Sequence, residues 1–183
     1  MLIRILFLFV VLTSYTNYGQ NLTKLDKKYH VEIQLGHAQI MDTDLSSTKG
    51  NVYNFVSSNG GMRAFTTTIN RKISNYTVGL GIGTIASLNY PTQSIPVILQ
   101  AKYWIPSSSR FYVGLEYGHG VEIGSIQASS VKSGELNIGK LFLLGKVNLL
   151  AELNVKRSSF IRYNKNHLTY KFTSLGISLG VLL

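Results

Sequence analysis

The stretch YTVGLGIG (residues 76–83) ends with glycine at every second position, with Leu80 and Ile82 between the glycines. Successive side chains of a β-strand point to opposite faces, so this segment would have one apolar face and one nearly bare face. A glycine-rich phosphate loop is the alternative, but that motif requires a helix after the glycines. Asn89 and Pro91 break the segment that follows. The stretch therefore predicts one strand in the wall of a β-structure.

A period of two also marks seven other segments. Six of them alternate apolar side chains with small or polar ones: residues 29–36, 96–103, 111–118, 133–142, 146–156 and 174–183. The seventh, residues 61–71, is rich in threonine and does not decide which face is apolar. Eight segments of roughly ten residues match the length of a tilted strand that crosses a membrane, about 9–11 residues.

The connections between these segments alternate in length. A long polar stretch at residues 40–60 precedes the tight KISN (72–75), and a loop around residues 89–91 precedes the short IPSSS (105–109). A Gly- and Ser-rich stretch near 121–132, a tight turn at 143–145 and the basic KRSSFIRYNKNH (156–167) complete the pattern. This alternation predicts an all-β fold, a single eight-stranded antiparallel up-and-down transmembrane β-barrel with tight turns at one end.

The composition agrees with an exterior that is partly hidden from water. Of 183 residues, 45% are hydrophobic and 14% are charged, against about 25% charged in ordinary soluble domains. The chain has no cysteine, which excludes disulfides and thiolate metal sites.

The first 19 residues are typical of an export signal. Arg4 supplies a positive charge, and residues 5–12 form an apolar run that is too short for a membrane helix of roughly 20 residues. We therefore predict a signal peptide at 1–19, an N-terminal periplasmic segment at 20–28 and a barrel at 29–183. Removal of residues 1–19 takes away one basic residue, Arg4. The mature chain then has 17 basic and 8 acidic residues, a net charge of +9.

Alternation alone does not say whether the apolar face of the strands is outside. A soluble lipocalin-like barrel has the same period with the two faces exchanged. In that arrangement the glycines of residues 76–83 and the Gly and Ser residues of 174–180 would face water and offer it almost no polar side chain. Inside a narrow eight-stranded barrel, small residues leave the room that larger side chains need. We therefore predict that the apolar face is outside.

Aromatic residues lie near the predicted short-turn end of the strands: Tyr76, Tyr103, Trp104 and Phe111. We interpret these four as a girdle at a membrane–water interface, although aromatic residues are also common near strand ends in general. Lys140 is on the apolar side of its segment near the same end, where its long side chain can extend to headgroups.

Charged and amide side chains share the inward side of the predicted strands. They form a predicted polar network in the lumen: Glu32, Gln34, Gln100, Lys102, Glu116, Lys146 and Glu152. A polar conduit is one interpretation. We favour charge pairing within a closed barrel, because unpaired buried charges are strongly destabilising and eight strands leave no open channel. Lys102 and Glu116, on adjacent strands, are expected to approach each other diagonally.

These features, with a signal that ends in YGQ, the segment IPVILQAKYWI before a serine turn and the final LGISLGVLL, resemble the small outer-membrane β-barrel family common in Bacteroidota. The resemblance covers nearly all of the mature chain. It implies a porin-like fold in the cell outer membrane, with a structural, surface-recognition or lipid-contacting role and no open pore. The chain departs from many such barrels by ending in Leu183 instead of an aromatic residue.

Two other functions are retained as alternatives. One is a secreted or periplasmic lipocalin-like barrel that binds an apolar ligand. The other is a lipid A-modifying enzyme with His119, Glu122 and Ser125 near one loop, a role that requires these groups within hydrogen-bond reach. We expect no enzyme, no cofactor and no metal site, since the four histidines lack the spacing of metal ligands.

Basic residues gather in KRSSFIRYNKNH. Arg157, Arg162 and Lys165 are predicted on an external loop, with Phe160 and Tyr163 between them. Such interleaving also occurs in nucleic-acid-binding proteins, but an exported chain seldom meets nucleic acid, and no nucleic-acid-binding motif is present. We therefore expect outer-membrane lipid, including lipopolysaccharide phosphates, as the partner. The sequence names no protein partner.

Overall fold

The computed structural model describes residues 28–46, 52–54, 60–87, 93–106, 110–123, 129–144, 147–162 and 168–183. The strands are β1 (Tyr29–Ser46), β2 (Val52–Asn54), β3 (Gly61–Ile73), β4 (Tyr76–Ser87), β5 (Gln93–Trp104), β6 (Phe111–Glu122), β7 (Ser129–Leu144), β8 (Val147–Arg162) and β9 (Leu168–Leu182). Within this described part of the chain, no helix is long and apolar enough to cross a membrane.

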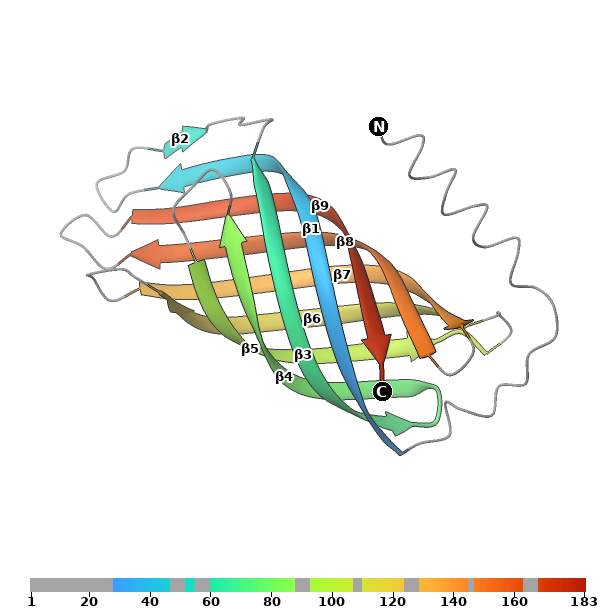
Figure 1. Ribbon diagram of the computed structural model, residues 1–183. Helices are drawn as coiled ribbons and strands as arrows, with labels where there is room; N and C mark the ends of the chain where they lie inside the picture. The colour runs from blue at the N-terminus through green and yellow to red at the C-terminus, as the bar shows by residue number, and fades with distance from the viewer. Residues whose placement is uncertain are drawn as a thin grey trace.

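Eight of these strands close into a barrel (Figure 1). From β3 to β9, each strand pairs antiparallel with the next one along the chain, and β1 pairs with both β3 and β9. The closing pair includes the last residue, because the Leu183 N–H donates to the Val31 carbonyl at 2.8 Å. In the described residues, β2 pairs only with the end of β1. The predicted eight-stranded antiparallel barrel is confirmed.

The strands are staggered around the barrel. Following directly paired residues once around the wall, starting at Glu32, leads back to β1 at Thr43. A bulge between Ile40 and Asp42 contributes one residue of this offset. A sheet that closes with such a stagger has strands tilted to the barrel axis, typically by about 35–45°, and the tilt is visible in Figure 1.

The two ends of the barrel differ in their connections. At the turn end, Ser74 and Asn75 connect β3 to β4, and residues 145–146 connect β7 to β8. Ser74 has a φ of 54°, the left-handed conformation that two-residue hairpin turns use. At the loop end, the connections are longer than these two turns, for example residues 163–167 between β8 and β9. The predicted alternation of short and long connections holds for the two-residue turns but not for residues 105–110 between β5 and β6, which match the length of the loop-end connection at 123–128.

The glycines of the opening stretch lie directly against β3. A Cβ on Gly81 would stand 2.1 Å from the carbonyl oxygen of Thr67, and a Cβ on Gly79 would stand 1.9 Å from Oδ1 of Asn70. The neighbouring strand therefore occupies the space that a side chain would need. The stretch is part of the barrel wall and not a phosphate loop.

Several strands continue beyond their apolar alternation toward the loop end. β1 continues to Ser46, β7 begins at Ser129 and β8 continues to Arg162. The predicted loops at 40–60, 121–132 and 156–167 therefore include residues that belong to strands in the structure. Backbone pairing does not depend on side-chain polarity, so the ladder extends past the apolar pattern from which the strands were predicted.

The undecided facing of residues 61–71 is also resolved. On β3, Thr66, Thr68 and Asn70 are buried inside the barrel, while Phe65 and Ile69 are exposed on the outside. The threonine-rich face therefore belongs to the lumen.

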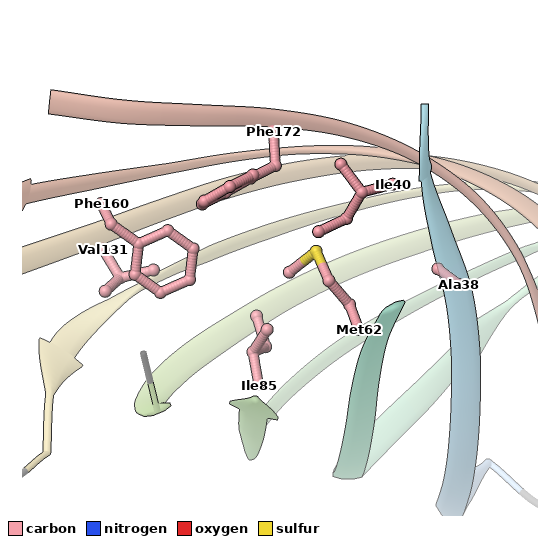
Figure 2. Packing of buried hydrophobic residues seen from close by; sticks show 7 residues of the cluster. All are labelled: Ala38, Ile40, Met62, Ile85, Val131, Phe160 and Phe172. Atoms are coloured by element: carbon pink, nitrogen blue, oxygen red, sulfur yellow. The ribbon is translucent and has the colours of Figure 1, made fainter. Parts of the chain in front are cut away.

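The apolar part of the interior is divided between the two ends. The first cluster, toward the loop end, consists of Ala38, Ile40, Met62, Ile85, Val131, Phe160 and Phe172, which point toward one another in Figure 2. The second cluster, toward the turn end, consists of Trp104, Tyr112, Leu141, Leu150 and Leu182. Neither cluster extends through the middle of the barrel.

The predicted signal peptide and most of the periplasmic segment, up to residue 27, lie outside the described residues, as do Ser125, Lys146 and Lys165.

Candidate functional site

A layer of buried polar side chains fills the middle of the lumen, between the two apolar clusters. Inward positions of several strands contribute to it, because alternate residues of each strand point to the barrel axis. Its charged members are Glu32, Lys102, Glu116, Glu135, Glu152 and Lys156. These six residues form two separate groups, each with one lysine between two glutamates.

The first group is centred on Lys102 of β5. Its Nζ lies 2.5 Å from Oε1 of Glu32 and 2.9 Å from Oε1 of Glu152. Gln34 donates to both carboxylates, and the hydroxyl of Tyr112 donates to Glu152. The side chains of Lys102, Glu32 and Glu152 are at most 2% exposed. The lysine therefore compensates two carboxylates at a place that water does not reach.

The second group is centred on Lys156 of β8. Its Nζ lies 3.1 Å from Oε2 of Glu135 and 3.8 Å from Oε1 of Glu116. Lys156 therefore pairs with its register partner on the neighbouring strand β7 and also reaches Glu116 of β6.

Lys102 and Glu116 are diagonal neighbours on adjacent strands, as expected, because Lys102 pairs in register with Gly114 and Glu116 pairs with Gln100. The ion pairs of Lys102, however, are formed with Glu32 and Glu152. In contrast to Lys156, Lys102 of β5 reaches across the lumen to Glu32 of β1 and Glu152 of β8.

Amide and hydroxyl groups link the polar layer to β3. Gln100 donates through Nε2 to Oδ1 of Asn70 at 2.6 Å and to Oγ1 of Thr68 at 2.7 Å. All three side chains are buried. Paired in this way, they avoid the penalty of buried polar groups without partners.

The structure places six of the seven residues of the predicted lumen network inside the barrel: Glu32, Gln34, Gln100, Lys102, Glu116 and Glu152. The seventh, Lys146, is outside the described residues. The sequence prediction missed Lys156 as the partner of Glu116, and Glu135 as the other partner of Lys156. Their inward parity on β8 and β7 was a signal for them, but parity does not say which charges meet across the lumen.

A continuous band of exposed apolar side chains surrounds the barrel. Every barrel strand contributes; members between 53% and 66% exposed include Leu35, Ile69, Leu80, Leu99, Leu115, Ile138 and Leu179. On β4 and β9, the apolar residues of the outer face alternate with buried or small ones through the whole band. The exterior is therefore apolar where the middle of the lumen is polar, the reverse of a lipocalin-like barrel.

Aromatic rings lie at the turn end of this band. The rings of Tyr76 and Tyr103 are 5.0 Å apart on neighbouring strands, and Nζ of Lys140 lies 4.8 Å from the centre of the Phe111 ring. Lys140 is covered by this ring and by that of Phe142. Its ammonium therefore packs against aromatic faces at the turn end of the wall.

Trp104 does not belong to the predicted girdle. Its side chain is buried inside the barrel, its Nε1–H donates to Oγ1 of Thr77 at 2.8 Å, and its ring lies 4.6 Å from that of Tyr112. The prediction grouped it by nearness to the strand end, whereas its parity, opposite to that of Tyr103, directs it inward. Tyr29 was missed, although it is 55% exposed at the same end.

The candidate catalytic residues are not brought together. His119 is exposed on the outer face of β6, while Glu122 is buried on the inner face of the same strand. Ser125 lies outside the described residues. Among the described residues, no group of three or more His, Asp or Glu side chains could hold a metal ion.

The predicted basic loop is largely a strand. Arg157 lies on the outer face of β8 with its side chain 67% exposed, and Lys156 points into the lumen. Arg162 ends β8, and Lys165 lies outside the described residues. Arg157 is therefore presented by the barrel wall and not by a loop.

No protein-family model and no curated protein matches the chain. Among solved structures, the outer-membrane protein AlkL in DMPC bilayers is 14% identical, with a TM-score of 0.44, over 91% of this chain and 95% of that one. Neisserial surface protein A is 12% identical, with a TM-score of 0.46, over 83% and 96% of the two chains. At such values, the description of the fold rests on the pairing of this chain's own strands, which form a closed eight-stranded antiparallel barrel.

Proposed function

We propose that the protein is an integral outer-membrane β-barrel with a structural, surface-recognition or lipid-contacting role and without catalysis. The observation that carries the proposal is the apolar band around all eight barrel strands. An exposed apolar surface of this extent on a soluble monomer would be exceptional. Contact with acyl chains accounts for it.

The height of the band supports this assignment. On β9 it runs from Leu175 to Leu183. At about 3.4 Å per residue and a tilt of roughly 40°, this stretch rises about 20 Å. The apolar band of outer-membrane barrels is roughly 25 Å tall. The ladder from β1 round to β9 also leaves no open edge in the wall, as hydrocarbon requires.

The packing of the lumen supports a role without an open pore. Apolar clusters lie toward both ends, and the polar layer between them is held by ion pairs at the barrel axis. Bound lipid is then the natural partner of the outer wall.

Cell fractionation tests the proposal. The protein is expected in the outer-membrane fraction, and the unboiled sample is expected to migrate differently from the boiled one on a denaturing gel, because a closed barrel resists the detergent until it is heated. Recovery in the soluble periplasmic fraction with one unchanged mobility would contradict the proposal.

A further inference from the structure

Cationic side chains gather on the outer wall directly beyond the apolar band at the loop end. We define the cationic patch as Lys132 of β7, Arg157 of β8 and Lys171 of β9, all exposed. Lys132 and Lys171 are the two register partners of Ser159, and Arg157 lies two residues from Ser159 on the same face. Direct partners on one face of a sheet are about 5 Å apart and diagonal ones about 7–8 Å. The three cations therefore share one small area.

The patch has an excess of positive charge. Asp44 of β1 is the register partner of Lys171, and its carboxylate lies 3.9 Å from Nη2 of Arg157. His119 of β6, the register partner of Lys132, adds a further titratable group on the other side. Asp42, also exposed on this face, is the register partner of Thr173 and a diagonal neighbour of Lys171. Two carboxylates therefore face three permanent cations, and like charges on neighbouring positions of a sheet repel each other. An anion from outside the protein would relieve this repulsion.

The level of the patch says where that anion comes from. Below Arg157 on the outer face of β8 lie Val155 and Leu153, and below Lys171 on β9, past Thr173, lies Leu175. If the band lies in hydrocarbon, the patch lies at the depth of the headgroups. Lys and Arg are the residues that bind phosphate groups, Arg through paired N–H donors and Lys as a point charge.

Gly134 adds room for such a group. It is the outer-face register partner of Arg157, and a Cβ placed on it would meet no atom within 4 Å. At most other glycines of the barrel, a Cβ would collide with a neighbouring strand or side chain. At Gly134, the outer wall at the position that pairs with Arg157 stays open.

We propose that Lys132, Arg157 and Lys171 form a binding surface for the phosphate headgroup of a lipid in the leaflet at the loop end of the barrel. This inference rests on the proposed function, because it requires that the apolar band lies in a membrane. It replaces the predicted basic loop by a surface on the wall of β7, β8 and β9.

Lipid-selective quenching tests the inference. Because the chain has no cysteine, Val155→Cys provides a single site for a fluorophore below the patch. Ile82→Cys provides the matched control on β4, a strand without charged residues. The labelled full-length mature barrel is refolded into phosphatidylcholine vesicles that contain spin-labelled phosphatidic acid or spin-labelled phosphatidylcholine.

At residue 155, we expect phosphatidic acid to quench with an apparent affinity about fivefold higher than phosphatidylcholine, on the basis of the attraction of a basic residue to an anionic membrane surface. At residue 82, the two lipids should quench equally. The variant Lys132→Gln/Arg157→Gln/Lys171→Gln should lose the preference at residue 155. The variant Lys28→Gln/Arg63→Gln/Arg71→Gln, which removes three exposed cations elsewhere, should keep it.

Equal quenching at residue 155 by both lipids, or a preference that survives the patch substitutions, would overturn the inference while the heat-shifted band still supported a membrane barrel. Inorganic phosphate that abolished the preference at an ionic strength where chloride did not would identify a soluble-anion site and also overturn it. A chain that gives no heat-shifted band in phosphatidylcholine alone would contradict the proposed function, and the inference would fall with it.

Discussion

One atom, Nζ of Lys102, neutralises two buried carboxylates in the polar layer of the lumen. It compensates Glu32 and Glu152, and the second carboxylate oxygen of each has no hydrogen-bond partner among the described residues. A buried carboxylate that loses its cation is strongly destabilised, because neither water nor another charge replaces the lost interaction. The stability of the barrel therefore depends on this one side chain more than on any exposed charge.

We expect Lys102→Met to lower the free energy of unfolding by about 3–5 kcal/mol. Adding Glu32→Gln and Glu152→Gln to this variant should recover most of the loss, since no buried charge is then unpaired. Urea unfolding of the refolded protein measures the effect. Lys171→Met, at an exposed position, is the control and should change the free energy by less than about 0.5 kcal/mol. Equal unfolding midpoints for the two single variants would contradict this account of the lumen.

Two glycines, Gly81 of β4 and Gly134 of β7, allow a second comparison between single residues. A methyl group on Gly81 would meet the backbone of Thr67, which cannot move aside without breaking the ladder, whereas a methyl group on Gly134 would meet nothing. We expect Gly81→Ala to destabilise the barrel by about 1–3 kcal/mol or more through overpacking. Gly134→Ala should fold as the unaltered chain does. The fraction of heat-shifted band after refolding measures both, and equal fractions would show that the strands do not approach as described.

The outer face of a single strand has positions within the apolar band and positions beyond it. On β6, Leu115 lies within the apolar band and is 62% exposed, whereas Val121 lies beyond His119 toward the loop end and is 60% exposed. Their exposure is almost equal, so a difference between them reports only what surrounds the barrel.

We expect Leu115→Arg to cost about 2–4 kcal/mol and Val121→Arg about 0–1 kcal/mol, as for arginine at the midplane and near the interface of a bilayer. Unfolding in phosphatidylcholine vesicles measures both values. In a soluble barrel, the two substitutions would have the same small effect, so equal values would argue against a membrane environment.

The existence and the facing of most strands could be predicted from the sequence because a wall with two different faces imposes a period of two. Strand ends could not be predicted, because β8 continues through Arg157 to Arg162 by backbone pairing alone. Trp104 was assigned by its position at a strand end, although its parity places it inside. The ion-pair partners of Lys102, Glu32 and Glu152, could not be predicted, because contacts across a lumen depend on the stagger of the closed barrel, which no single segment contains.

At the scale of the whole molecule, the two apolar clusters toward the ends of the lumen predict that the barrel does not conduct ions. We expect no stepwise current when the refolded protein is added to a planar lipid bilayer, with insertion verified by protease protection of the inserted barrel. Steady single-channel steps from inserted protein would contradict a sealed lumen.

Because the strands are staggered, the apolar band runs around the barrel at one level along its axis. The band and the barrel axis together define the orientation of the molecule in a membrane. Aromatic rings lie along the turn end of the band and the cationic patch lies beyond its loop end. Both features follow from one claim, that the outer face of the strands contacts acyl chains.

Site-directed spin labelling tests this claim most directly, with one cysteine at a time at Leu80, Leu115, Leu179 or Val121, four outer-face positions that are 57–66% exposed. In phosphatidylcholine vesicles, labels at the first three positions are expected to collide often with oxygen and rarely with a water-soluble nickel chelate. The label at Val121 is expected to show the reverse. Nickel collisions that are equally frequent at all four positions would contradict the account, because the band would then face water.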